Sequence, residues 1–296
     1  MGRSTSRRRR SVLRGVLGTT LLVAVTGVGA LGVAGLLGRL DSPAPVVRCA
    51  AALDGTDWYL ATDQADTAAL LVATSVRREM PARAATIAIA TGLQESKLRN
   101  IDYGDRDSVG IFQQRPSQGW GTVEQIMDPV YSTNAFFDGL ARVEGYQDLP
   151  VTEAAQAVQR SGFPDAYAQH ETRSRAWASA LTGNSTAAVS CTLREPGGPG
   201  DPAALLARAE RDFGALTGAV GQDGAVLLDH SALAGAQDDV DRLGWAVSQW
   251  AVAVASPLEV VEVEHAGQVW TRDSAGWSVS DREGPPTGQV RVVLAG

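Results

Sequence analysis

Apolar residues are distributed very differently before and after Asp41. From Gly15 to Gly38 an apolar run of 24 residues is almost uninterrupted. As a helix it would extend about 36 Å, enough to cross a hydrocarbon core of about 30 Å. Arginines cluster before the run, and no convincing signal-cleavage site follows it. We therefore expect residues 1–40 to form a cytoplasmic basic tail and a single-pass signal anchor, with the bulk of the protein outside the cytoplasm. A cleaved signal peptide and a buried core helix are the alternatives.

Residues 41–194 show mainly the apolar spacing of amphipathic helices. Residues 41–56 are interpreted as a linker, and the polar, glycine-rich segment Gly104–Gly121 as a loop or short strand. Thr122 with Gln125 three residues later indicates a capping box. The pattern predicts helices over Asp63–Met80, from Pro81 to about Leu98, from Pro129 onward, from a Thr152 cap through Arg160, and over Asp165–Leu181.

The chain changes character after residues 195–202 (EPGGPGDP), whose composition is that of a linker. Residues 203–296 contain β-branched or alternating segments together with two helical patterns, so we expect a small α+β domain there. The fold class of the whole chain is therefore α+β. The predicted helices cover about Pro202–Phe213 and Ala236–Ala255, and the strands Ala225–Asp229, Leu258–Glu264, Gln268–Thr271, Trp277–Ser280 and Gln289–Leu294.

The net charge of -7 hides an asymmetry between the tail and the rest of the chain. Seven of the 26 basic residues precede Asp41, so residues 41–296 carry 19 basic and 33 acidic residues, a net charge of -14. Nucleic-acid binding needs a basic face, so we do not expect this acidic protein to bind nucleic acid. The histidines, His170, His230 and His265, are too far apart to show a metal-ligand spacing, so neither a metal nor a cofactor is expected.

Two cysteines bracket the predicted helical region. A disulfide between Cys49 and Cys191 would close that region at both ends in an oxidising compartment, and the chain-entropy model gives such a loop about 4–5 kcal/mol. Two buried free thiols are the alternative.

The segment Ala85–Gly121 carries the candidate chemistry. A helix of small and apolar residues becomes polar at Gln94–Lys97, which places Glu95 near the carboxyl end of a buried helix. Burial and the negative end of the helix dipole should both raise the pKa of Glu95. Glycosidic cleavage requires a carboxylic acid that stays protonated, because the leaving oxygen must receive a proton.

The E-S pair of Glu95–Ser96, followed by the G-I-F-Q of Gly110–Gln113, resembles the lysozyme-like fold of lytic murein transglycosylases and goose-type lysozymes. The resemblance covers about residues 50–190. It implies that Glu95 is the general acid/base and that the substrate is a peptidoglycan glycan strand. It also implies a sugar subsite lined by Ser96, Gly110, Ile111, Phe112 and Gln113, with further sugar contacts from Tyr131, Gln159 and Tyr167.

The second catalytic group is less determined by the sequence. A retaining hydrolase needs another carboxylate close to the first, and Asp102, Asp105 and Asp107 are candidates. The transglycosylase route needs only Glu95, because the substrate's acetamido group assists and its 6-hydroxyl closes an anhydro ring; we favour this route. Trp120, in a glycine-rich loop, is a candidate for stacking on a sugar ring or a packing residue.

The last domain resembles, more weakly, a degenerate relative of zinc D-Ala-D-Ala carboxypeptidases. Gln289 and Arg291 stand where those relatives carry histidines, and Asp229–His230 alone cannot hold catalytic zinc. We therefore expect a wall-binding or scaffolding role for this domain. Protein partners cannot be predicted from the sequence.

The widest resemblance is to exported proteins of high-GC Gram-positive bacteria, some of which are labelled heavy metal transporters. Two alternatives to a peptidoglycan-cleaving enzyme therefore stay open. One is a non-catalytic wall- or partner-binding membrane protein with an inactive lysozyme-like domain, and the other, less favoured, is an accessory protein of a heavy-metal transport system.

Overall fold

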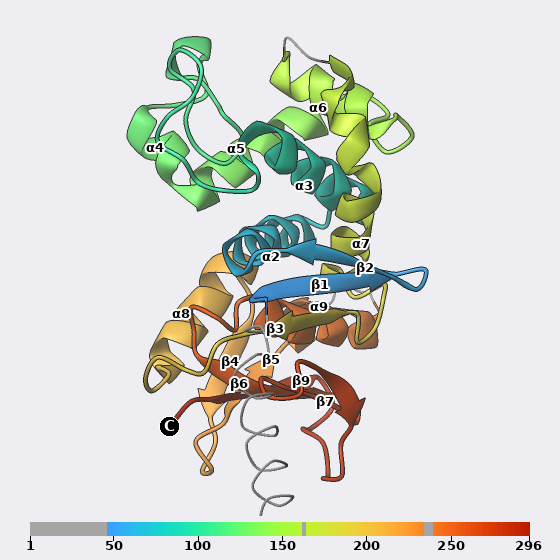
Figure 1. Cartoon of the computed structure of the whole chain (residues 1–296), viewed down its shortest axis with the longest axis vertical. Helices are drawn as coiled ribbons and strands as arrows, with labels where there is room; N and C mark the ends of the chain where they lie inside the picture. Colours follow the sequence, from blue (N-terminus) through green and yellow to red (C-terminus); the bar gives the residue numbers. More distant parts are fainter. Residues whose placement is uncertain (1–45, 162–163, 234–238) are drawn as a thin grey trace, which may run out of the picture. The chain divides into compact units, whose positions relative to one another are not determined.

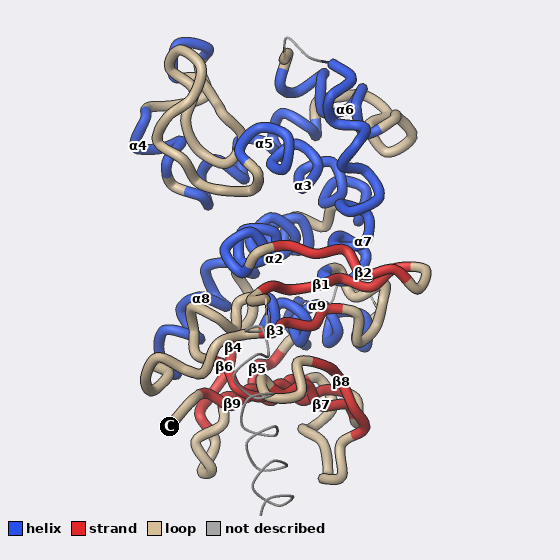
Figure 2. Tube along the Cα trace, in the orientation of Figure 1, coloured by secondary structure: helices blue, strands red, loops and turns tan. Residues whose placement is uncertain are grey.

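The computed structural model describes residues 46–161, 164–233 and 239–296. The predicted span Gly15–Gly38 lies outside these residues. Among the helices within them, none has both the length and the apolar character that a bilayer crossing requires. Residues 47–296 form one compact unit, in which helices and antiparallel sheets alternate in layers (Figures 1 and 2).

The helices predicted for the first half are present, with small shifts at their ends. The capping box of Thr122 and Gln125 is confirmed, with Gln125 N donating to Thr122 Oγ1 at 3.2 Å. The Thr152 cap is wrong, because the helix already begins at Val151 with Pro150 at its N-cap. The predicted helix Asp165–Leu181 is two elements, a 3₁₀ helix and an α-helix. The helices are α2 (Thr62–Arg77), α3 (Ala82–Ser96), η1 (Pro116–Gln118), α4 (Val123–Met127), α5 (Pro129–Ala141), α6 (Val151–Gln159), η2 (Pro164–His170) and α7 (Glu171–Leu181).

A three-stranded antiparallel sheet corrects the interpretation of residues 41–56 as a linker. It has the order β2-β1-β3, with β1 (Arg48–Leu53), β2 (Thr56–Leu60) and β3 (Val189–Thr192). The central strand β1 buries three consecutive small residues, Cys49 to Ala51. A short strand covered on both faces lacks the alternation that identifies a half-buried strand, which is why the pattern did not predict it.

The second half contains a six-stranded antiparallel sheet with the order β4-β5-β9-β6-β7-β8. Predicted and observed bounds agree closely, but the short, mostly exposed edge strand β4 and the short 3₁₀ helix η3 were not predicted. Residues 193–201 contain no helix or strand. The elements are α8 (Pro202–Phe213), β4 (Thr217–Val220), β5 (Val226–Asp229), η3 (Ser231–Leu233), α9 (Val240–Ala253), β6 (Val260–His265), β7 (Gln268–Thr271), β8 (Gly276–Val279) and β9 (Gln289–Leu294).

Helix α9 joins the two halves. It packs on β6 and β9 of the large sheet and also on α2, α7 and β3. Every residue from Leu243 to Ala253 is buried. Because both sides of this helix are covered, the apolar core continues from the helical half into the large sheet.

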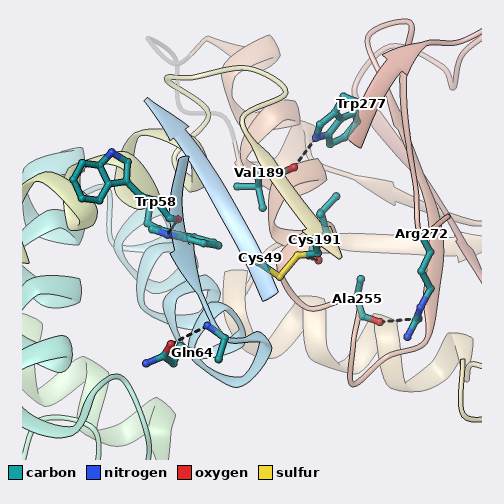
Figure 3. The surroundings of a disulfide bond; sticks show 11 residues. Cys49, Trp58, Gln64, Val189, Cys191, Ala255, Arg272 and Trp277 are labelled. Carbon is teal, nitrogen blue, oxygen red and sulfur yellow. Dashed lines mark hydrogen bonds between the residues drawn. A yellow bond between two sulfur atoms is a disulfide. The ribbon is translucent and has the colours of Figure 1, made fainter. Parts of the chain in front are cut away.

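The predicted disulfide between Cys49 and Cys191 is present (Figure 3). It joins directly opposed residues of β1 and β3, and the two cysteines are 142 positions apart in the sequence. Close to it, Trp277 Nε1 of β8 donates to Val189 O of β3 at 2.7 Å. The disulfide thus links two neighbouring strands of the small sheet, and the hydrogen bond from Trp277 links that sheet to the large sheet.

Candidate functional site

Glu95 lies in the last turn of α3, a helix buried on nearly all sides between α2, α5, α6, α7 and η2. The helix ends because Lys97 and Leu98 adopt left-handed backbone conformations, with φ of 57° and 58°. Leu98 N then donates to Gly92 O at 2.8 Å, which satisfies one of the last helical carbonyls. Glu95 is consequently half-buried at the point where the core helix reaches the surface.

Two side chains from other elements hold the Glu95 carboxylate. Tyr167 Oη of η2 donates to Glu95 Oε1 at 2.6 Å, and Gln159 at the end of α6 also hydrogen-bonds to Glu95. Burial raises the pKa of Glu95, and the hydrogen bonds from Tyr167 and Gln159 oppose this rise without cancelling it. The result is a carboxyl group that keeps its proton at higher pH than an exposed glutamate does.

Tyr167 is fully buried, so it reaches Glu95 from inside the core and not from a sugar-binding surface. Burial, together with the hydrogen bond and negative charge of Glu95, raises the pKa of the Tyr167 phenol. The phenol therefore stays protonated and remains a donor to Glu95. Gln94 helps to position this segment, because its Oε1 accepts from Gln169 Nε2 of η2 at 3.2 Å.

The loop that carries Gly110–Gln113 is fixed to the end of α3. Ser96 Oγ donates to Ile111 O at 2.7 Å, and Gln159 Nε2 donates to Phe112 O at 2.6 Å. The side chains of Ser96, Ile111 and Phe112 are all buried, and Phe112 stacks on Phe136 of α5 at 4.3 Å between ring centroids. These residues could therefore contact a ligand only through their backbone atoms.

Gly110 is required by its surroundings. Its φ is +82°, and an added Cβ would lie 2.9 Å from Ile126 O. Gln113, also left-handed with φ of 49°, is half-buried and donates through Nε2 to Tyr103 O and Gly110 O, both at 3.3 Å. These contacts make the segment a rigid support beside Glu95.

The predicted second carboxylates have other environments. The Asp105 side chain is 90% exposed and lies 3.8 Å from Arg106 Nε. Asp107 accepts from Arg115 Nε at 2.6 Å and from Ser117 N at 2.8 Å, and hydrogen bonds from these two residues lower its pKa well below the usual range. Asp107 thus stabilises its own loop. Within the described part of the chain, the pKa of Glu95 is set by burial and by Tyr167 and Gln159, and no neighbouring carboxylate contributes to it.

A groove of about 730 Å³ lies next to this cluster, between α5, α6 and the loop at Gly119. Three predicted sugar contacts line it, Trp120, Tyr131 and Gln159. Tyr131 Oη donates to Trp120 O at 3.2 Å, which fixes the loop over α5. Glu95 is not among the lining residues; Gln159 connects it to the groove through its side chain.

Sequence analysis did not identify three charged residues of the groove, Asp138, Arg142 and Arg160. They belong to no motif, and only the packing of α5 against α6 brings them together. Within residues 46–161, 164–233 and 239–296, no three His, Cys, Asp or Glu side chains are grouped so that they could hold a metal ion.

Comparison of the sequence with protein-family models and with curated proteins gives no match.

Proposed function

We propose that the protein cleaves the glycosidic bonds of peptidoglycan strands with Glu95 as general acid and base, in a lysozyme-like domain. The observation that carries this proposal is a half-buried carboxyl group with a raised pKa, held by Tyr167 and Gln159 beside a groove lined by Trp120 and Tyr131. Aromatic rings beside a protonated acid suit a sugar polymer whose leaving oxygen must be protonated.

The single acid favours the transglycosylase route over hydrolysis. Protonated Glu95 gives its proton to the glycosidic oxygen as the C1–O bond breaks, and the acetamido carbonyl of the same sugar bonds to C1. Glu95, now a carboxylate, then takes the proton of the 6-hydroxyl, whose oxygen displaces the acetamido group and closes a 1,6-anhydro ring. Neither Asp105 nor Asp107 is needed, in agreement with their exposure and their engagement in the loop.

The place of action proposed is the outer face of the cell membrane, with residues 1–40 as the anchor. The disulfide between Cys49 and Cys191 supports export, because such bonds persist in oxidising compartments.

Product analysis tests the chemistry. Purified peptidoglycan is incubated with the wild-type protein and with Glu95→Gln, and the soluble fragments are weighed by mass spectrometry. We expect the wild type to release fragments with anhydro ends, each lighter by one water than the hydrolytic product, and Glu95→Gln to lose about a thousandfold in rate. If all fragments had reducing ends, the transglycosylase route would be wrong and the reaction would be hydrolysis.

A second candidate is a domain that binds glycan without cutting it. It is favoured by one observation, that the groove is not lined by Glu95 itself. Retained binding to peptidoglycan by both proteins, with no soluble product from the wild type, would select this alternative.

A further inference from the structure

The lining of the groove beside Glu95 includes more basic than acidic side chains. Two arginines line it, Arg142 at the end of α5 and Arg160 at the end of α6, and both are exposed. The lining acid, Asp138, is already engaged, since its Oδ1 lies 2.6 Å from Arg78 Nη2. Among the residues that the structure describes, no carboxylate lies within ion-pair distance of Arg142 or Arg160.

The groove arginines are set against the net negative charge of the body. Residues 41–296 carry a net charge of -14, so the body of the protein repels anions at long range. Two unpaired guanidinium groups in a concave site counter that field locally. Guanidinium groups bind carboxylates through paired N–H donors, so an acidic ligand fits this end of the groove better than a neutral one.

The same groove has a surface suited to sugars. Trp120 is held by the bond from Tyr131, and its ring lies beside Gly139 of α5, where an added Cβ would be at contact distance, 3.6 Å from Trp120 Cη2. Aromatic side chains and two arginines thus face one cavity, whose wall at Gln159 reaches Glu95. The combination suits a glycan that bears carboxylates.

We propose that Arg142 and Arg160 bind the carboxylates of the muramyl sugars, so that the groove selects acidic peptidoglycan over a neutral glycan of the same backbone. This inference rests on the proposed function and names what the groove recognises. The carboxylates have two sources, the lactyl group of a bare muramyl sugar and the stem peptide attached to it.

Binding assays in a Glu95→Gln background test the inference without turnover. The polymers are peptidoglycan freed of teichoic acid, the same material with its stem peptides removed by an amidase, and chitin, which has no carboxylate. Binding is measured at low and high salt for the parent and for Arg142→Gln/Arg160→Gln. The matched control, Arg175→Gln/Arg194→Gln, removes two exposed arginines that do not line the groove.

We expect the groove variant to bind intact peptidoglycan about tenfold more weakly at low salt, with chitin binding unchanged and the control variant like the parent. Arg142→Lys/Arg160→Lys should recover part of the affinity, which separates loss of charge from loss of fold. Tighter binding of the peptide-stripped polymer than of intact peptidoglycan would assign the contact to the lactyl carboxylate, which is an amide while the stem peptide is attached. Weaker binding of the stripped polymer would assign the contact to the peptide carboxylates, and equal binding would mean that either carboxylate serves.

Unchanged binding of peptidoglycan, equal losses on chitin, or an equal loss in the control variant would overturn the inference. So would a parent protein that binds none of the three polymers. The proposed function fails separately, if the protein with Glu95 intact releases no soluble fragments while these binding results hold.

Discussion

At the scale of single residues, the environment of Glu95 combines opposing effects. Burial favours the neutral acid, whereas the donors Tyr167 and Gln159 favour the carboxylate. An acid that gives and then takes a proton in successive steps needs both forms, and these two effects act on the pKa of Glu95 in opposite directions. Tyr167 serves this balance as a positioning residue, since it is fully buried and donates to the Glu95 carboxylate.

Tyr167→Phe should therefore change the pH profile as well as the rate. The hydrogen bond from Tyr167 lowers the pKa of Glu95, so its removal raises that pKa further and moves the alkaline limb of the activity profile to higher pH. We expect a fall in kcat of about tenfold, because the carboxylate loses one of two groups that orient it. Activity on peptidoglycan across the pH range measures both effects.

Tyr59→Phe is the matched control, because the Tyr59 hydroxyl bonds only to exposed Asp57 in the described structure. It should leave the rate and the profile unchanged. A slower Tyr167→Phe enzyme with the wild-type pH profile would mean that the phenol contributes packing alone.

At the scale of elements, the sequence predicted the bounds of helices and strands best where one face of the element is buried and the other is exposed to solvent. The strands at Gln268–Thr271 and Gln289–Leu294 and the helix at Pro202–Phe213 have the predicted bounds. The small sheet was not predicted, because β1 is a short run of small residues covered on both faces and β3 has only four residues. Its partners are distant in the sequence, and pairing across 142 positions leaves no local signal.

The same limit applies to the site. The position of Glu95 followed from the change of helix character at Gln94, and the Ser96 and Gly110 segment was expected nearby. The engagement of Asp107 by Arg115 and the charges of Arg142 and Arg160 depend on loop and helix packing, which residue spacing does not encode.

A pair of buried histidines makes the contact between α9 and the large sheet sensitive to acid. His230 and His265 lie with their rings nearly perpendicular, 5.7 Å between centroids, and both face Gly244 of α9, where any Cβ would collide with them. Neither ring nitrogen of His230 has a hydrogen-bond partner within the described residues. Burial, followed by the nearby His265, lowers the pKa of His230 to about 4, and burial also lowers that of His265.

Stability should consequently fall on acidification. Unfolded histidine has a pKa of about 6.5, so between that pH and about 4 the unfolded chain binds protons that the folded protein excludes. His230 alone should cost roughly 3 kcal/mol of unfolding free energy over this window. Urea denaturation at several pH values should show a shallower loss for His230→Gln than for wild type. Parallel curves for wild type and His230→Gln would contradict this prediction.

At the scale of the whole molecule, the two halves are joined by buried polar contacts as well as by apolar packing. Gln249 of α9 is fully buried and makes four hydrogen bonds to the backbone around α7 and β3. Its Oε1 accepts from Ala188 N at 2.7 Å and Val189 N at 2.9 Å, and its Nε2 donates to Ala180 O at 2.6 Å and Ser185 O at 2.8 Å. One side chain thus satisfies the backbone of a connection that would otherwise be buried unpaired.

A second contact of the same kind lies on the other side of α9. Asp212 of α8 is fully buried and accepts from Trp250 Nε1 at 2.9 Å and from Arg208 Nε at 2.8 Å. Arg208 in turn donates to Asp66 of α2 at 2.8 Å. These contacts connect the second half to α2, and α2 packs on α3, which carries Glu95.

Replacing Gln249 by methionine should therefore destabilise both halves together. The substitution keeps the volume but removes the acceptor of the buried Ala188 N and Val189 N and the side-chain donor to Ala180 O and Ser185 O, which should cost about 3–5 kcal/mol. Tryptophan fluorescence and far-UV circular dichroism during urea unfolding should report one shared transition, displaced to lower urea in the variant. Ser248→Ala is the control on the same helix, because among the described residues its hydroxyl bonds only to Trp245 O of α9 itself. If the halves were independent, unfolding would occur in two steps, and Gln249→Met would displace only one of them. The region after residue 194 could then be removed without loss of the fold around Glu95.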